Sequence, residues 1–291
     1  MRSLPVLLAL LVPVVFSGRV QTTERPTDGR TVPFLDHRPG AVVVPVSVDK
    51  AGPYRFLVDT GSTHTAVRDT VAASIGAVPV ARTTLSTSAG RADALVVRLP
   101  RVAIGSAAVD ELLATSLTAA AAGVLGDGIA GVIGQDFLSQ FDYTLDYRRS
   151  ALIWEHDLDD RPGVRVPLVP AAGRFLIEVP RPETGDPPLR LVPDSGANAL
   201  VLFRRAADAN GAIETGAASF ELASMAGRVS AQAARVRAFE VGGVRVCAQI
   251  AGVVAAPSDA EPADGLLPLD LFASVSFNNQ RRYIIVQPRE P

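Results

Sequence analysis

Two aspartates follow apolar runs and precede turns of small residues. Asp59 follows Phe-Leu-Val and precedes Thr-Gly-Ser at 60–62, and Asp194 follows Leu-Val-Pro and precedes Ser-Gly-Ala at 195–197. A carboxylate beside buried strand residues is costly unless neighbouring groups donate hydrogen bonds to it. Two carboxylates that meet share one proton and provide one general base and one general acid around a single water molecule. Amide hydrolysis without a nucleophilic side chain requires this combination of groups.

The neighbours of both aspartates are suited to supporting a carboxylate. A glycine permits a backbone turn that points amides at the acid, and hydroxyls can fix the loop. Ser62 is expected to donate a hydrogen bond to Asp59, whereas Ala197, at the matching place after Asp194, has no hydroxyl. This difference predicts that Asp59 holds the negative charge and that Asp194 holds the proton. The supporting residues are Thr60, Gly61, Ser62, Ser195 and Gly196.

The two motifs belong to an internal repeat. Asp59 and Asp194 are 135 positions apart, and three further landmarks recur in the same order at nearly the same offset. A repeated order of this kind indicates a tandem duplication. The recurring pairs are 56–62 with 190–197, 85–91 with 222–228, 104–105 with 241–242, and 131–137 with 265–271.

Each copy of the repeat has the pattern of β-strands. Short apolar, β-branched runs alternate with Gly and Pro, which is typical of an all-β fold. Only 67–75 and 136–141 have helical character, with Asp136 expected to cap the second of these helices. The Pro-rich stretch 160–170 is expected to connect the halves. The strands are expected at 41–48, 54–58, 94–104, 143–154 and 274–287.

On these motifs the sequence resembles the aspartic proteases, and it is more similar to the retropepsin-like group than to the large pepsins. The residues at 59–62 and 194–197 match the two active-site motifs, and Gly-Val-Ile-Gly at 131–134 matches the apolar-apolar-Gly element behind the first. The resemblance implies two pseudo-symmetric barrel lobes, at 41–158 and 159–291, with an active-site cleft between them. It also implies that Asp59 and Asp194 are the catalytic pair and that no cofactor is needed.

Members of this family hold an extended peptide beneath flexible β-hairpin flaps, a binding mode that resembles strand addition. The resemblance therefore implies a peptide or protein substrate. Two places with small residues suit flap tips, one after each aspartate, and a mobile hairpin with no ligand role is the alternative. The candidate flap residues are Ser88, Ala89 and Gly90 in the first half and Met225, Ala226 and Gly227 in the second.

Two prolines in the second half depart from the family pattern. Pro193 cannot donate the backbone hydrogen bond expected before Asp194, and Pro268 replaces the glycine found at 134. They suggest a distorted second lobe, so two alternatives to an aspartic endopeptidase stay open. One is a non-catalytic peptide-binding protein on the same scaffold. The other is a structural or carrier protein without a cleft that an extended peptide can enter.

Composition excludes several classes of protein. With 28 Lys and Arg against 30 Asp and Glu, the net charge is −2, which argues against nucleic-acid binding. The single cysteine, Cys247, rules out a disulfide within the chain and a zinc site built from cysteines, and it is expected to be a small buried residue. The three histidines have no ligand spacing, so no metal site is expected.

The first residues have the pattern of an export signal. Arg2 precedes the apolar stretch 4–16, which is short for a membrane span and is followed by Ser17 and Gly18. We expect a signal peptide at 1–18, a linker at 19–40 and a secreted or periplasmic protein with no stable membrane insertion after cleavage. An uncleaved membrane anchor is the alternative. Because both aspartates lie on one chain, a monomer is expected.

Overall fold

The computed structural model describes residues 28–36, 41–87, 90–181, 185, 187–209, 213–224, 227–258 and 260–289. Strands account for 55% of the structure and helices for 11%, which confirms the expectation of an all-β fold. The expected signal peptide at 1–18 lies outside the described residues. The expected linker at 19–40 is described only at 28–36, where Thr31–Pro33 forms strand β1.

The N-terminal lobe is a seven-stranded sheet in the order β2-β3-β8-β4-β7-β6-β5, and β2 also pairs with β6. The extra pairing closes six of these strands into a barrel. Three short helices and one 3-10 turn connect them: α1 (Asp69–Ser74), α2 (Ala119–Ala122), η1 (Gly123–Leu125) and α3 (Gln135–Leu138). The strands are β2 (Val43–Val48), β3 (Ala51–Val58), β4 (Ala66–Arg68), β5 (Pro79–Thr87), β6 (Gly90–Ile104), β7 (Ala107–Leu117) and β8 (Gly131–Ile133).

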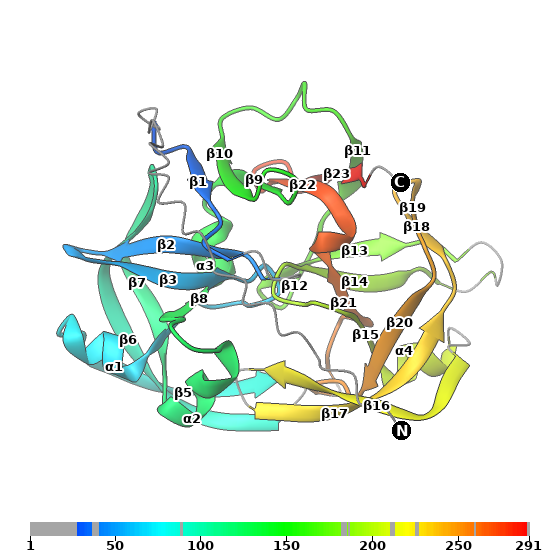
Figure 1. The fold of residues 1–291 in the computed structure, drawn as a ribbon, viewed down its shortest axis with the longest axis horizontal. Coiled ribbons are helices and arrows are strands. Elements are labelled where there is room, and N and C mark those ends of the chain that lie inside the picture. The colour runs from blue at the N-terminus through cyan, green and yellow to red at the C-terminus, as the bar shows by residue number, and fades with distance from the viewer. Residues whose placement is uncertain are drawn as a thin grey trace, which may run out of the picture.

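The C-terminal lobe repeats this plan in an eight-stranded sheet in the order β12-β13-β14-β21-β15-β20-β17-β16, with β18 and β19 as a separate hairpin (Figure 1). Its helices are α4 (Arg204–Ala209) and the 3-10 turn η2 (Leu269–Leu271). The strands are β12 (Val169–Ala171), β13 (Arg174–Val179), β14 (Leu189–Asp194), β15 (Leu200–Phe203), β16 (Ile213–Ser224), β17 (Gly227–Val236), β18 (Phe239–Val241), β19 (Val244–Val246), β20 (Gln249–Val254) and β21 (Gly265–Pro268).

A third sheet joins the two lobes and takes strands from both halves of the chain, in the order β1-β10-β9-β22-β23-β11. It crosses the boundary expected at 158–159. The connection expected at 160–170 contains β11 and part of β12, so this stretch is largely strand rather than linker. The remaining strands are β9 (Asp142–Asp146), β10 (Ala151–Glu155), β11 (Val164–Pro167), β22 (Phe272–Asn278) and β23 (Tyr283–Pro288).

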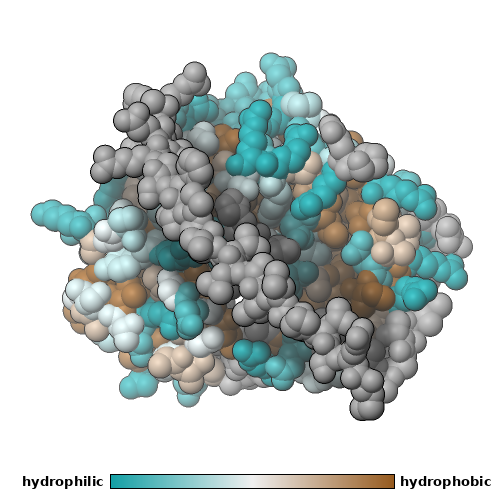
Figure 2. Space-filling view, in the orientation of Figure 1, coloured by the Kyte–Doolittle hydropathy of each residue, from teal (hydrophilic) through white to brown (hydrophobic). Residues whose placement is uncertain are grey.

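The hydrophobic core runs through both lobes and the third sheet. At the junction of the halves, the rings of Tyr143 on β9 and Phe277 on β22 stack with their centroids 4.8 Å apart. Trp154 on β10 meets Tyr143 nearly edge-on. On the face shown in Figure 2, apolar side chains gather over both lobes among hydrophilic ones. In the part of the chain that the structure describes, no helix has both the length and the apolar character of a membrane span.

Candidate active site

The structure brings Asp59 and Asp194 together where the two lobes meet. Asp59 directly follows β3, which pairs in parallel with β8, and Asp194 ends β14, which pairs in parallel with β21. Their side chains lie within hydrogen-bonding range of each other. Two residues 135 positions apart in the sequence thus form one pair of carboxyl groups, because equivalent strand ends of the two copies face each other.

The loops after the two strands hold their carboxylates in the same way. The Oδ1 atom of Asp59 accepts hydrogen bonds from the backbone amides of Gly61 and Ser62, at 2.9 and 3.0 Å. The Oδ1 atom of Asp194 accepts the two corresponding amides, from the residues two and three positions on, at 2.7 and 3.1 Å. Each motif therefore turns its own backbone toward its acid, as the glycine positions predict.

The two loops are tied to each other by a reciprocal set of hydrogen bonds. The Thr60 hydroxyl donates to the carbonyl of Pro193 at 2.7 Å and accepts from the amide of Ser195 at 3.0 Å. In mirror fashion, the Ser195 hydroxyl donates to the carbonyl of Val58 at 2.7 Å and accepts from the Thr60 amide at 3.1 Å. All four bonds are buried. The two hydroxyls therefore hold the aspartate loops of the two lobes together.

Each motif glycine packs against the aspartate of the opposite lobe. A Cβ atom at Gly61 would lie 2.5 Å from Oδ2 of Asp194, and one at Gly196 would lie 2.8 Å from Cγ of Asp59. These separations are too short for a side chain of any size at either position. The glycines therefore allow the two carboxyl groups to approach, in addition to permitting the turns.

The two prolines alter the second lobe without displacing its acid. In the first lobe, the amide of Val58 donates to the carbonyl of Val42 at 2.8 Å, a bond that Pro193 cannot make. Pro193 nevertheless keeps its place in the ladder opposite Leu267, and its carbonyl accepts the Thr60 hydroxyl. Pro268 has φ −65° and ψ 131° and ends β21. The distortion expected from Pro193 and Pro268 therefore leaves the hydrogen bonds to the Asp194 carboxylate intact.

The expected hydrogen bond from the Ser62 hydroxyl to Asp59 is wrong. That hydroxyl donates to the carbonyl of His64 at 2.9 Å, and only the Ser62 amide reaches the carboxylate. Ser62 and Ala197 consequently contact their aspartates in the same way, because each donates its backbone N–H to the carboxylate. The difference in pKa between Asp59 and Asp194 therefore does not come from the Ser62 hydroxyl.

Burial and mutual repulsion set the protonation of the pair. Burial raises the pKa of Asp194 well above its usual range, and the negative charge of Asp59 raises it further. Burial also raises the pKa of Asp59, but its hydrogen bonds with Asp194 and with the loop amides and the positive charge of Arg174 act in the opposite direction. The proton of the pair therefore lies on Asp194 and the charge on Asp59, because the surroundings favour the ionised form more at Asp59.

Residues behind the first loop help to hold it in place through hydrogen bonds that the sequence did not reveal. Asp136, interpreted as a helix cap, accepts hydrogen bonds from both the amide and the hydroxyl of Thr65, and α3 begins after Gly134 with no side-chain cap. The side chain of Gln135 donates to the carbonyl of Thr60 at 2.8 Å. Both residues directly follow the repeated apolar-apolar-Gly element, and that position was the only available signal for a role in holding the loop.

The hairpins expected to carry flaps are present. β5 pairs with β6 up to Thr87 opposite Gly90, and β16 pairs with β17 up to Ser224 opposite Gly227. Gly90 and Gly227 thus begin the second strand of each hairpin, and both hairpins lie along the lower edge of the view in Figure 1. β16 also contacts η1 of the N-terminal lobe. The other four candidate flap residues, Ser88, Ala89, Met225 and Ala226, lie outside the described residues.

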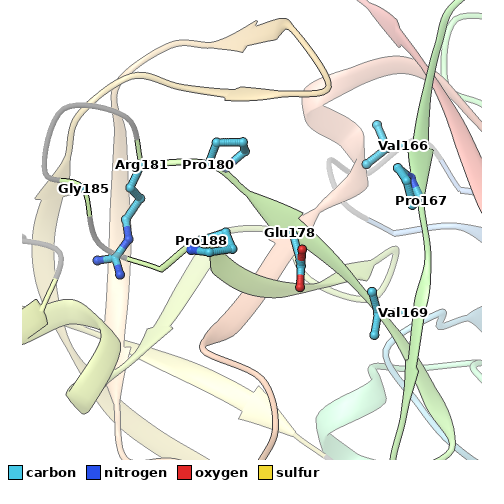
Figure 3. A pocket seen from close by; sticks show the side chains of 8 residues that line it. All are labelled: Val166, Pro167, Val169, Glu178, Pro180, Arg181, Gly185 and Pro188. Atoms are coloured by element: carbon cyan, nitrogen blue, oxygen red, sulfur yellow. The ribbon is translucent and has the colours of Figure 1, made fainter.

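Two cavities lie in the C-terminal half, and neither is lined by Asp59 or Asp194. The smaller, about 490 Å³, has side chains from β11, β12, β13 and the segment after β13 around it, including Glu178 and Arg181 (Figure 3). The larger, about 840 Å³, lies between the end of β13 and β18. Among the described residues, no group of three or more His, Cys, Asp or Glu side chains could hold a metal ion. Cys247, expected to be buried, is exposed.

The comparisons with known proteins agree with this geometry. A family model described as aspartyl protease matches residues 44–137 and again residues 182–271, together more than half of the chain. The chain belongs to the aspartyl protease family. Each match contains one aspartate motif, as a duplicated member of the aspartyl protease family requires.

The structure is similar to the crystal structure of an aspartic proteinase from Irpex lacteus, with a TM-score of 0.51 and 13% sequence identity. The match covers 89% of this chain and 97% of that one, so the two share the bilobal fold over nearly their whole length. A comparison with curated proteins found no match.

Proposed function

We propose that this aspartyl protease family member is an endopeptidase that hydrolyses peptide bonds with a water molecule activated between Asp59 and Asp194. The observation that carries the proposal is the pair of carboxyl groups where the lobes meet, with Asp194 buried and Asp59 half-buried, within hydrogen-bonding range of each other and held in the same way by two loops. A close pair that shares one proton provides a base and an acid at the same time. Because the surroundings favour the ionised form more at Asp59, Asp59 is proposed as the base and Asp194 as the acid.

In the proposed reaction, the ionised Asp59 takes a proton from water while the water oxygen bonds to the peptide carbonyl carbon. The protonated Asp194 gives its proton to the carbonyl oxygen, and a neutral tetrahedral diol results. The intermediate then returns a proton to the pair from one hydroxyl, the amide nitrogen accepts a proton from the pair, and the C–N bond breaks. The products are a carboxylic acid and an amine, and the pair again holds one proton.

The hairpins β5–β6 and β16–β17 are proposed to act as flaps over an extended substrate. Their position supports this role, because both lie on one side of the molecule and β16 contacts the opposite lobe. A peptide that runs between the two lobes can pair its backbone with such strands. Because both aspartates come from one chain, the active species is proposed to be a monomer, with residues 41–158 and 159–291 supplying one aspartate each.

The decisive experiment is a peptide cleavage assay from acidic to neutral pH on the purified chain and on the double variant Asp59→Asn, Asp194→Asn. Cleavage by the wild type that a statine-type inhibitor blocks, and that the double variant lacks, supports the proposal. A folded wild type that binds the inhibitor without cleaving any peptide would instead favour the non-catalytic peptide-binding alternative. A wild type that neither binds nor cleaves would leave the structural or carrier alternative.

We further propose export to a secreted or periplasmic location, supported by the apolar stretch at 4–16 followed by small residues. N-terminal sequencing of exported protein checks this. A mature chain that begins soon after Ser17 agrees with a cleaved signal, whereas an intact Met1 in a membrane fraction agrees with an anchor.

A further inference from the structure

The peptide group between Thr60 and Gly61 is hydrogen-bonded at both ends. Its N–H, on Gly61, donates to Oδ1 of Asp59 at 2.9 Å, and its carbonyl, on Thr60, accepts the side-chain amide of Gln135 at 2.8 Å. In a trans peptide the carbonyl and the N–H lie in one plane and point in opposite directions. A donor that fixes the carbonyl therefore also directs the N–H at the Asp59 carboxylate.

Gln135 is fixed in this orientation. Its backbone amide donates to the carbonyl of Ser62 at 2.9 Å, so the residue holds the aspartate loop at a second point. The residue is buried, with 4% of its surface exposed. If its side-chain amide were flipped, Oε1 would face the carbonyl oxygen of Thr60, and two acceptors cannot form a hydrogen bond. The site therefore requires Nε2 on the side of Thr60.

The C-terminal lobe lacks this donor. In the repeat, the position that matches Gln135 is Leu269, which is fully buried and has an apolar side chain. The amide of Gly196 donates to Asp194 as the amide of Gly61 does to Asp59. The side chain of Leu269 cannot donate to the carbonyl at the other end of that peptide group. The two aspartate loops thus differ in one side-chain donor.

The cost of burying Gln135 indicates a role beyond packing. Its Oε1 atom is buried and has no hydrogen-bond partner among the described residues. Buried polar atoms are nearly always paired in native proteins, and an unpaired one lowers stability. Leu269 shows that an apolar side chain can occupy the matching position. Residues that break a folding rule in this way are expected at functional sites.

Resting on the proposed function, we propose that Gln135 is a positioning residue that makes Asp59, rather than Asp194, the base of the pair. It acts through the peptide group between Thr60 and Gly61. By donating to the carbonyl, Gln135 keeps the N–H directed at the carboxylate, and it strengthens that bond because linked hydrogen bonds polarise one another. A stronger hydrogen bond to the charged form of a carboxyl group favours ionisation.

The test compares the pH dependence of kcat/KM in the wild type and in Gln135→Met, whose side chain has a similar length and no donor. The acidic limb reports the lower apparent pKa of the pair, at which Asp59 takes up its proton. Loss of the donor disfavours the ionised form, so the limb should move to higher pH by about half a unit. The Asp194 carboxyl and the Arg174 guanidinium, which also act on Asp59, are the same in both proteins.

Folding is measured separately, because loss of the fold alone would also lower activity. Gln135→Leu, which copies the residue of the other lobe, is the second variant should Gln135→Met unfold. Each change removes one buried unpaired acceptor, Oε1, and leaves another, the Thr60 carbonyl, so the midpoint of urea unfolding should change little. Gln140→Met is the matched control, because the exposed Gln140 donates its side-chain amide to the carbonyl of Asp136 at 2.7 Å. It should leave the acidic limb in place.

The inference is overturned if the acidic limb stays in place in folded Gln135→Met and Gln135→Leu, or if Gln140→Met moves it equally far. A carboxyl titration separates this failure from failure of the proposed catalysis. Carbon NMR of protein with isotope-labelled aspartate carboxyls gives the lower apparent pKa of the pair without turnover, and the signal lost in Asp59→Asn identifies Asp59. A rise of this pKa in Gln135→Met supports the positioning role even if no peptide is cleaved. An unchanged pKa rejects it even in an active enzyme.

Discussion

The two lobes are built from the same ladders, yet among the described residues only the N-terminal lobe has a pairing that closes its barrel. In both, a strand leading to the aspartate pairs in parallel with the apolar strand behind it, β3 with β8 and β14 with β21. In both, a short strand after the aspartate loop pairs in parallel with a later strand of the same lobe, β4 with β7 and β15 with β20. The N-terminal lobe adds the pairing of β2 with β6, at Ser47 with Ala103 and Val48 with Val102.

The described part of the C-terminal lobe has no such closing ladder. β13 ends at Val179, directly before Pro180, which has no N–H for a further strand pair. On the other side, pairing stops at Val236 with Gln249 and resumes at Phe239 with Val246 as the separate hairpin β18–β19. The cavity of about 840 Å³ lies between these two edges.

This difference shows which part of the duplicated unit the aspartates depend on. The ladders common to both lobes include those of the two strands that lead to the aspartates, and the loops after these strands make nearly identical hydrogen bonds to the carboxylates. The closing ladder, which the lobes do not share, makes none of these hydrogen bonds. The halves have diverged at the barrel edge and have kept the elements that position the acids.

The largest expected effect tests whether the lobes are equal in chemistry. Asp59→Asn and Asp194→Asn should each lower kcat by about a thousandfold or more, because the acid and the base are both needed. Initial rates on one peptide measure this, with circular dichroism to confirm folding. Full activity of Asp194→Asn, with specific activity rising with protein concentration, would instead mean that two copies of Asp59 from different chains form the pair.

The next effect tests the close approach of the loops. Gly61→Ala and Gly196→Ala each place a Cβ atom against the opposite carboxyl group, so both should lose activity by about 10- to 100-fold, and Gly61→Ala should lose more. Gly123→Ala is the control, because a Cβ atom there has no atom within 4 Å and the residue has helical φ. Peptide cleavage and thermal unfolding measure all three variants. An active Gly61→Ala enzyme would contradict the described separation of the loops.

A smaller effect tests the reciprocal hydrogen bonds. Thr60→Val and Ser195→Ala each leave one buried backbone N–H and one buried carbonyl without a partner, so each should reduce the free energy of unfolding by about 2–4 kcal/mol. Urea denaturation of the two variants provides the measurement. Because the bonds mirror each other, the two losses should be similar. A loss confined to one variant would show that one lobe anchors the other.

The smallest expected effect tests whether Arg174 or the Ser62 hydroxyl makes the pKa of Asp59 differ from that of Asp194. The positive charge of Arg174 lowers the pKa of Asp59, so in Arg174→Gln that carboxylate accepts its proton at a higher pH. Because the ionised form of Asp59 is the base, the acidic limb of the pH–rate profile should move to higher pH. In Ser62→Ala the limb should stay in place, since the lost hydroxyl bonds His64, and stability should fall by about 1 kcal/mol. A limb that moves in Ser62→Ala and not in Arg174→Gln would reverse the assignment.

The sequence predicted what depends on local pattern and on the repeat. Alternation of apolar runs with Gly and Pro indicated strands, because strand and turn preferences act over a few neighbouring residues. The recurrence of one motif at an offset of 135 indicated two lobes and one pair of acids, because duplicated units that pack about a two-fold axis bring equivalent loops together. The turn chemistry of Gly61 and Gly196 followed from residue type alone.

The tertiary structure decided every feature that depends on which distant groups meet. The Ser62 hydroxyl donates to the carbonyl of His64 rather than to the Asp59 carboxylate, and the positive charge of Arg174 acts on Asp59 although 115 positions separate them. The sheet shared by the halves and the open edge of the second barrel were likewise not visible in the repeat. Side-chain partners and strand neighbours are fixed by packing across the whole chain, and a pattern of neighbouring residues does not contain that information.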